Sequence, residues 1–185
     1  MYNVPEMSLK SNKIAKWVGI SGSWAITTKE VERDVRKAVR DVINNGGGIV
    51  TGGALNVDSF ATDEVIKMDP RCEHLRIFLP VTLKLYSAHY RKRAKEGVIT
   101  KKQAEDLIAQ LEYVKKANSK AIIENKDNKA VDKTTYFERN TKVVGASDEL
   151  YAFHIKESMG GGTIDTAEKA KKLGIPVRRF DYNGK

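Results

Sequence analysis

The chain has 185 residues, 41% of them hydrophobic, so it can bury an ordinary core without disulfides or a structural metal. Its net charge of +9 favours polyanionic partners such as nucleic acid or nucleotides, unless it serves solubility alone. The one cysteine, Cys72, excludes an internal disulfide and is typical of a reducing compartment. No apolar run suggests a signal peptide or a membrane span of about 18 residues. We therefore expect a cytoplasmic protein with no membrane partner.

The first third of the chain predicts alternating strands and helices. An apolar run at residues 16–21 predicts a buried strand. In the helix that we expect next, four valines recur at helical spacing: Val31, Val35, Val39 and Val42. Thr27 and Glu30 have the spacing of a capping box at its start, and the glycines at 46–48 predict its end. A strand at 48–53, a helix at 56–68 and a strand at 74–81 follow.

Residues 84–133 form a strongly basic region. They hold 13 Lys or Arg and 7 Asp or Glu, a net of +6 that accounts for most of the charge of the chain. Within this region, residues 100–118 predict a helix with a capping box made by Thr100 and Gln103. Residues 121–124 predict a short strand. We interpret the region as a basic helical insertion.

The last third returns to regular alternation. It predicts a helix that ends near Gly145, a strand at 149–155, a helix at 163–174 and a strand at 175–182. Alternating strands and helices with short connections favour parallel pairing with helices on both faces. The prediction is a single α/β domain, 1–185, with a three-layer Rossmann-like parallel sheet.

Three loops that join a strand to a helix carry glycines and hydroxyls: Gly19–Trp24, Thr51–Ser59 and Lys156–Thr166. In a parallel sheet such loops lie beyond the carboxyl ends of the strands, where ligands bind, and their N–H groups can approach phosphate oxygens. The alternative is that each is only a tight turn. Neither GxGxxG nor a P-loop is present. The residues that we predict to bind phosphate or ligand are Gly22, Ser23, Gly52, Gly53, Asp58, Arg139, Asn140, Gly161, Gly162 and Thr163.

Several side chains near these loops have two interpretations. Arg139 can pair with a phosphate or form a surface ion pair. Asp58 can bind a ribose or a base edge, or cap its helix. Trp24 is a candidate for stacking on a base. Tyr136 and Phe137 can do the same, although core packing is commoner for such a pair.

Cations are interleaved with aromatic residues near position 90. The four cations are Arg91, Lys92, Arg93 and Lys95. They suit a nucleic-acid backbone, or they form a solvated helix face. The three histidines, at positions 74, 89 and 154, lack metal-ligand spacing, so we expect no metal site.

Four blocks, GISGS, GGGIVTGGALNVDSFATDEVIK, ERNTKVVGASDELYAF and GGGTIDTAEKAKKLGIPV, resemble in order the Rossmann domain of the DNA-processing protein A (DprA/Smf) family. That family belongs to the SLOG superfamily. The blocks span about Lys16 to Tyr182, except residues 84–133. The resemblance implies a nucleotide or single-stranded nucleic acid as the partner, and a homodimer or higher homo-oligomer.

The LOG-like relatives in that superfamily are phosphoribohydrolases, which cut the N-glycosidic bond of nucleoside monophosphates. Arg139 matches their catalytic arginine, but Thr166 stands where their glutamate is expected and Asp165 is one position away. The resemblance therefore favours a non-catalytic protein that binds a nucleotide or single-stranded DNA, with no certain cofactor. The alternative is a nucleotide N-glycoside hydrolase or transferase that uses Glu138, Arg139 and Asp165. A third interpretation is a carrier or sensor of a phosphorylated cofactor.

Overall fold

The computed structural model describes residues 13–156 and 162–183. All its strand pairs are parallel, in one sheet of order β4-β3-β2-β1-β5-β6. The strands are β1 (Trp17–Gly22), β2 (Gly48–Thr51), β3 (Leu75–Leu79), β4 (Ile122–Glu124), β5 (Glu149–Ile155) and β6 (Val177–Tyr182). The helices are α1 (Lys29–Asn44), α2 (Val57–Met68), α3 (Leu83–Lys95), α4 (Lys101–Ala117), α5 (Lys133–Gly145) and α6 (Gly162–Lys172), with a short 3-10 turn at Ser119–Ala121.

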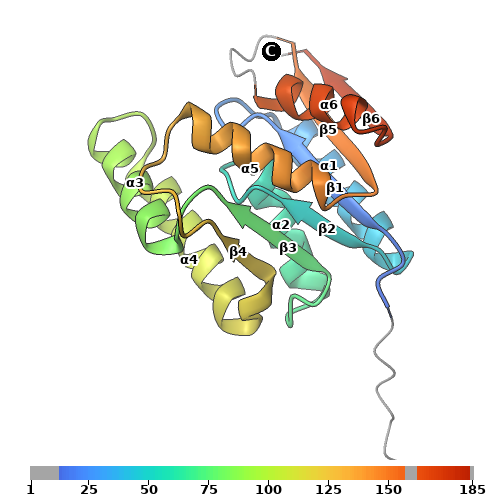
Figure 1. Ribbon diagram of the computed structural model, residues 1–185, viewed down its shortest axis with the longest axis horizontal. Helices are drawn as coiled ribbons and strands as arrows, with labels where there is room; N and C mark the ends of the chain where they lie inside the picture. Colours follow the sequence, from blue (N-terminus) through green and yellow to red (C-terminus); the bar gives the residue numbers. More distant parts are fainter. Residues whose placement is uncertain (1–12, 157–161, 184–185) are drawn as a thin grey trace, which may run out of the picture.

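Helices cover both faces of the sheet (Figure 1). The helices α1 and α2 lie behind it, and α5 and α6 lie in front. The three-layer parallel architecture predicted from the sequence is confirmed. In the part of the chain that the structure describes, no helix is long and apolar enough to cross a membrane.

The start of α1 differs from the prediction by one residue. Its N-cap is Thr28, whose extended backbone lets the hydroxyl accept the N–H of Val31 at 3.2 Å. The Thr27 hydroxyl is buried, with no hydrogen-bond partner among the described residues. The predicted capping box of Thr27 and Glu30 is therefore wrong. Two adjacent threonines could each have been the N-cap, and the helix begins after the second one. The predicted valine face of α1 is buried in the core.

The basic region builds part of the sheet and its core. Strand β4 pairs with β3 at the sheet edge. The helices α3 and α4 bury Tyr86, Tyr90, Leu107 and Leu111 in the main hydrophobic core. The predicted capping box of α4 is present, because the Thr100 hydroxyl accepts the Gln103 N–H at 3.1 Å and the Gln103 side chain accepts the Thr100 N–H at 2.8 Å.

Helix α5 begins at the carboxyl edge of the sheet. Its N-cap is Asp132, which forms a capping box with Thr135. The spacing of Tyr136, Arg139 and Asn140 places these three side chains on one face of the helix. That face points to the ends of β1 and β2, where the candidate site lies.

Candidate functional site

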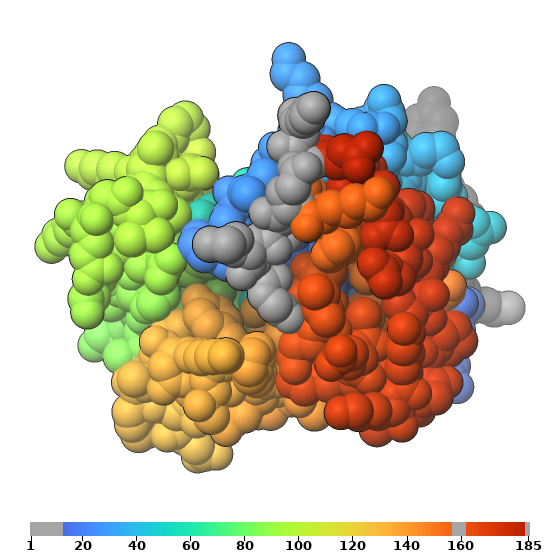
Figure 2. Space-filling view, turned by 90° about the horizontal axis from the view of Figure 1, so that it is seen from above, coloured from blue at the N-terminus to red at the C-terminus, as the bar shows by residue number. Residues whose placement is uncertain are grey.

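A pocket of about 540 Å³ lies at the carboxyl edge of the sheet. Its lining comes from the end of β1, the loop after β2, and the helices α3, α5 and α6. The chain proceeds from β1 toward β2 and from β5 toward β6, so it leaves β1 and β5 in opposite directions. Such a switch point is where open parallel sheets bind ligands. The space-filling view shows the surface hollowed between α3, in green, and α5, in orange (Figure 2).

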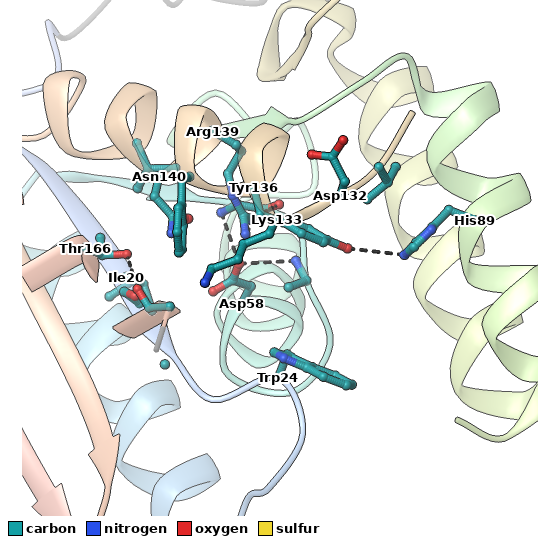
Figure 3. A pocket seen from close by; sticks show the side chains of 18 of the residues that line it. Ile20, Trp24, Asp58, His89, Asp132, Lys133, Tyr136, Arg139, Asn140 and Thr166 are labelled. Carbon is teal, nitrogen blue, oxygen red and sulfur yellow. Dashed lines mark hydrogen bonds and ion pairs between the residues drawn. The ribbon is translucent and has the colours of Figure 1, made fainter. Parts of the chain in front are cut away.

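Arg139 lies at the wall formed by α5 and by the loop after β2. Only 10% of its side chain is exposed. Its Nη1 donates to the carbonyl oxygen of Gly52 and lies 3.6 Å from Asp58 Oδ2. Its Nε is buried, with no hydrogen-bond partner in the described residues. Gly52, Asp58 and Arg139, each expected at the binding site from the sequence, are neighbours in one pocket. Figure 3 shows the side chains of Asp58 and Arg139.

Asp58 organises the loop between β2 and α2. Its carboxylate accepts the backbone N–H groups of Gly52 and Ala54, each at 3.1 Å. Burial raises the pKa of this carboxyl, while Arg139 and the two N–H groups act in the opposite direction. Asp58 does not cap its helix, because the N-cap of α2 is Asn56 and the Asp58 carboxylate accepts N–H groups of the preceding loop instead. Asp58 also lines the pocket, so its predicted role in ligand binding stays a prediction.

Asn140 links α5 to α6. Its amide donates to Asp165 Oδ2 at 3.1 Å, and Lys169 donates to the same oxygen at 2.8 Å. Lys169 also donates to the carbonyl oxygen of Phe137. Asn140 lines the pocket and Asp165 does not. These contacts join α5 to α6 beside the pocket.

The last residue of β1, Gly22, and Trp24 in the loop after it contribute to the lining. A Cβ on Gly22 would lie 2.5 Å from the Val57 side chain, so β1 and α2 meet here without room for a larger residue. The Arg93 guanidinium, from α3, lies 4.8 Å from the centre of the Trp24 ring. Of the four predicted cations of α3, Arg93 is the one that lines the pocket.

The other three cations of α3 point elsewhere. Arg91 forms two hydrogen bonds with Glu105 of α4, at 3.0 and 3.1 Å. The Lys92 ammonium lies 3.7 Å from the carboxylate of Glu96, the C-cap of α3. Lys95 is exposed at the end of α3.

Several predicted residues lie outside the pocket lining. Ser23 accepts the N–H groups of its own loop, and Gly53, at φ 65°, faces Ile77 and Leu79. Thr163 is buried in α6 beside a smaller cavity. Glu138 is exposed and accepts a hydrogen bond from the Asn128 amide at 2.9 Å. Gly161 lies outside the described residues, and Gly162 lines the pocket.

Sequence reasoning missed the part that α3 and the start of α5 play in the pocket. Its lining includes His89, Tyr90, Asp132 and Lys133. The Tyr136 hydroxyl lies 3.5 Å from His89 Nε2. Burial, followed by the charge of Arg93, lowers the pKa of His89. A signal was present, because residues 86, 89, 90 and 93 have the spacing of one helix face.

Metal ligands do not gather in this structure. Within residues 13–156 and 162–183, no group of three or more His, Cys, Asp or Glu side chains could hold a metal ion. The lining of the pocket combines cations, the carboxylates Asp58 and Asp132, and aromatic rings.

No family model matches the chain, and no curated protein sequence matches it. DNA processing protein A from Helicobacter pylori, described for its single-stranded DNA binding mode, superposes with a TM-score of 0.65 and 20% identity over 89% of this chain. DNA processing protein A (DprA) from Streptococcus pneumoniae gives 0.59 and 16% over the same share. This chain has a DprA-like Rossmann fold. It covers 64% of the first of those chains and 50% of the second. The DprA-like fold predicted from the sequence blocks is confirmed.

Proposed function

We propose that the pocket binds single-stranded DNA or a nucleotide and that it holds phosphate oxygens beside Arg139. The observation that carries this proposal is a nearly buried arginine in a pocket at the switch point of a parallel sheet. A planar guanidinium in such a place can donate to two oxygens of a phosphate. The H. pylori neighbour with the same fold has a described single-stranded DNA binding mode, which supports the same ligand class here.

The other lining residues suit this ligand. Arg93 and Lys133 add two cations to Arg139 in the lining, against the two carboxylates Asp58 and Asp132. The apolar and aromatic walls give a base a surface on which to stack. A pocket of about 540 Å³ is within the usual size range for a small-ligand site.

We favour binding over catalysis because the candidate carboxylates have structural partners. Asp58 accepts two backbone N–H groups, and Asp132 accepts one from Thr135. Glu138 accepts from Asn128, and Asp165 accepts from Asn140 and Lys169. A glycoside hydrolase needs a carboxyl group free to act at the reacting carbon or the leaving group.

Fluorescence anisotropy of a labelled single-stranded oligonucleotide tests the proposal. Arg139→Ala should weaken binding by roughly tenfold or more, because the phosphate loses a charged partner of about 1.4 kcal/mol or more. The control is Arg71→Ala, because Arg71 is an exposed arginine in the turn before β3, at the other edge of the sheet. Circular dichroism confirms that both variants fold.

Three outcomes separate the interpretations. Unchanged affinity in Arg139→Ala, with the oligonucleotide still bound, would remove Arg139 from the site. Binding of a labelled mononucleotide, without binding of the oligonucleotide, would favour a small-nucleotide carrier or sensor. Release of free base from a nucleoside monophosphate would overturn the non-catalytic part of the proposal.

A further inference from the structure

Trp24 stands at the pocket with its side chain unusually open. It is 39% exposed, and it is one of the lining residues. Figure 3 shows it on the opposite side of the pocket from Arg139 and Asn140, with Asp58 between them. A large apolar ring in such a place has given up burial that is usually worth more than a kcal/mol, about 1.5–3 for a large apolar side chain. The exposed face of the indole is therefore available to pack against a ligand in the pocket.

The loop that carries Trp24 is held in shape by its neighbours. The Asn56 amide donates to the Trp24 carbonyl oxygen at 2.6 Å. The Ser23 hydroxyl accepts the N–H groups of Ala25 and Ile26, at 3.3 and 3.0 Å. Asn56 adopts a φ of 61°, which few non-glycine residues adopt. These contacts fix the backbone on both sides of the ring, so the indole is presented in advance of any ligand.

Arg93 reaches Trp24 from a distant part of the chain. Its guanidinium lies 4.8 Å from the ring centre, within the range of a cation–π contact. The contact joins α3 to the loop after β1. It also places a positive charge next to the aromatic surface, which is the combination that proteins use to hold single-stranded nucleic acid.

We infer that Trp24 and Arg93 form a nucleobase platform, on which one base stacks while its phosphate reaches toward the Arg139 side of the pocket. This inference rests on the proposed function and makes it more specific. The pocket binds one nucleotide unit by its base as well as by its backbone. Stacking is tolerant of base identity because every base has a π face.

An abasic strand separates the two contributions, since it keeps the phosphates and lacks the bases. For these measurements the substitution Trp17→Phe is introduced into the parent protein. Trp24 is then the one remaining tryptophan of the two in the chain. Trp24→Ala should weaken binding of an oligothymidine roughly 5- to 150-fold and leave binding of an abasic strand of equal length unchanged. Trp24→Phe should restore most of the loss. The fluorescence of Trp24 should be quenched by the oligothymidine and not by the abasic strand.

Tyr113→Ala is the matched control, because Tyr113 is an aromatic residue of α4 with 43% exposure, outside the pocket lining. It should bind both strands as the parent does. Equal effects of Trp24→Ala on the two strands, or no effect on either, would overturn the platform and leave the proposed function standing. Failure of the parent to bind either strand would overturn the proposed function, and the platform with it.

Discussion

At the scale of single residues, Gly52 and Arg139 set the tightest limit on the site. A Cβ at position 52 would lie 1.5 Å from Arg139 Nη1, so Gly52→Ala must displace the guanidinium from its place. We expect oligonucleotide affinity to fall about as much as in Arg139→Ala, roughly tenfold or more. Anisotropy titration measures this loss.

The control for that prediction is Gly145→Ala. A Cβ there meets nothing within 4 Å, and the residue lies at the end of α5, away from the pocket lining. It should bind as the parent does. If Gly52→Ala bound with unchanged affinity, the position of the guanidinium would not determine binding.

The sequence did not predict which residues of each loop line the pocket. The sequence indicated the loops of Gly22, Gly52 and Asp58, because glycines after strands mark the carboxyl edge. It could not show that Gly53 and Ser23 turn away. That depends on the φ of 65° at Gly53 and on hydrogen bonds of Ser23 within its own loop.

At the scale of elements, the two adjacent threonines before α1 make a sharp test. Thr28→Ala removes the hydroxyl that accepts the Val31 N–H, and we expect it to lower the free energy of unfolding by about 1 kcal/mol. Thr27→Val removes a buried hydroxyl that has no partner among the described residues and should lower it by less. Thermal unfolding followed by circular dichroism compares the two. If Thr27→Val lowered the free energy of unfolding more than Thr28→Ala, Thr27 and not Thr28 would be the N-cap of α1.

Periodicity predicted most elements because strands and helices bury different spacings of apolar residues. Periodicity did not predict the inner face of α3, because many charged residues surround the four that form it: Tyr86, His89, Tyr90 and Arg93. The capping box of α4 was predicted correctly because Thr100 has no competing neighbour. The cap of α1 was not, because Thr27 and Thr28 compete for the same role.

At the scale of the whole molecule, charge and fold give different kinds of information. The net charge of +9 indicated a polyanionic partner, and the order of the sequence blocks indicated the DprA-like fold. Neither indicated which cations face the pocket, since that depends on how α3 and α5 approach the sheet edge. The predicted homo-oligomer and the single domain stay predictions.

The salt dependence of binding measures how many of these cations contact phosphate. Three of them line the pocket, Arg93, Lys133 and Arg139, and each phosphate contact with a single strand contributes a slope of about −0.7 to log affinity against log salt. We expect a slope of about −2, which is roughly a twentyfold loss between about 50 and 200 mM salt. Anisotropy titrations at several salt concentrations give this slope.

Two sets of variants then compare how much the cations of α3 contribute to the salt slope. Arg93→Ala should reduce the slope by about 0.7. Neutralising Arg91 and Lys92 together should change it less, because both already face carboxylates, Glu105 and Glu96. A slope near zero would exclude phosphate contacts as the source of affinity. If neutralising Arg91 and Lys92 reduced the salt slope more than Arg93→Ala does, the outer face of α3 would be the surface that contacts the DNA backbone.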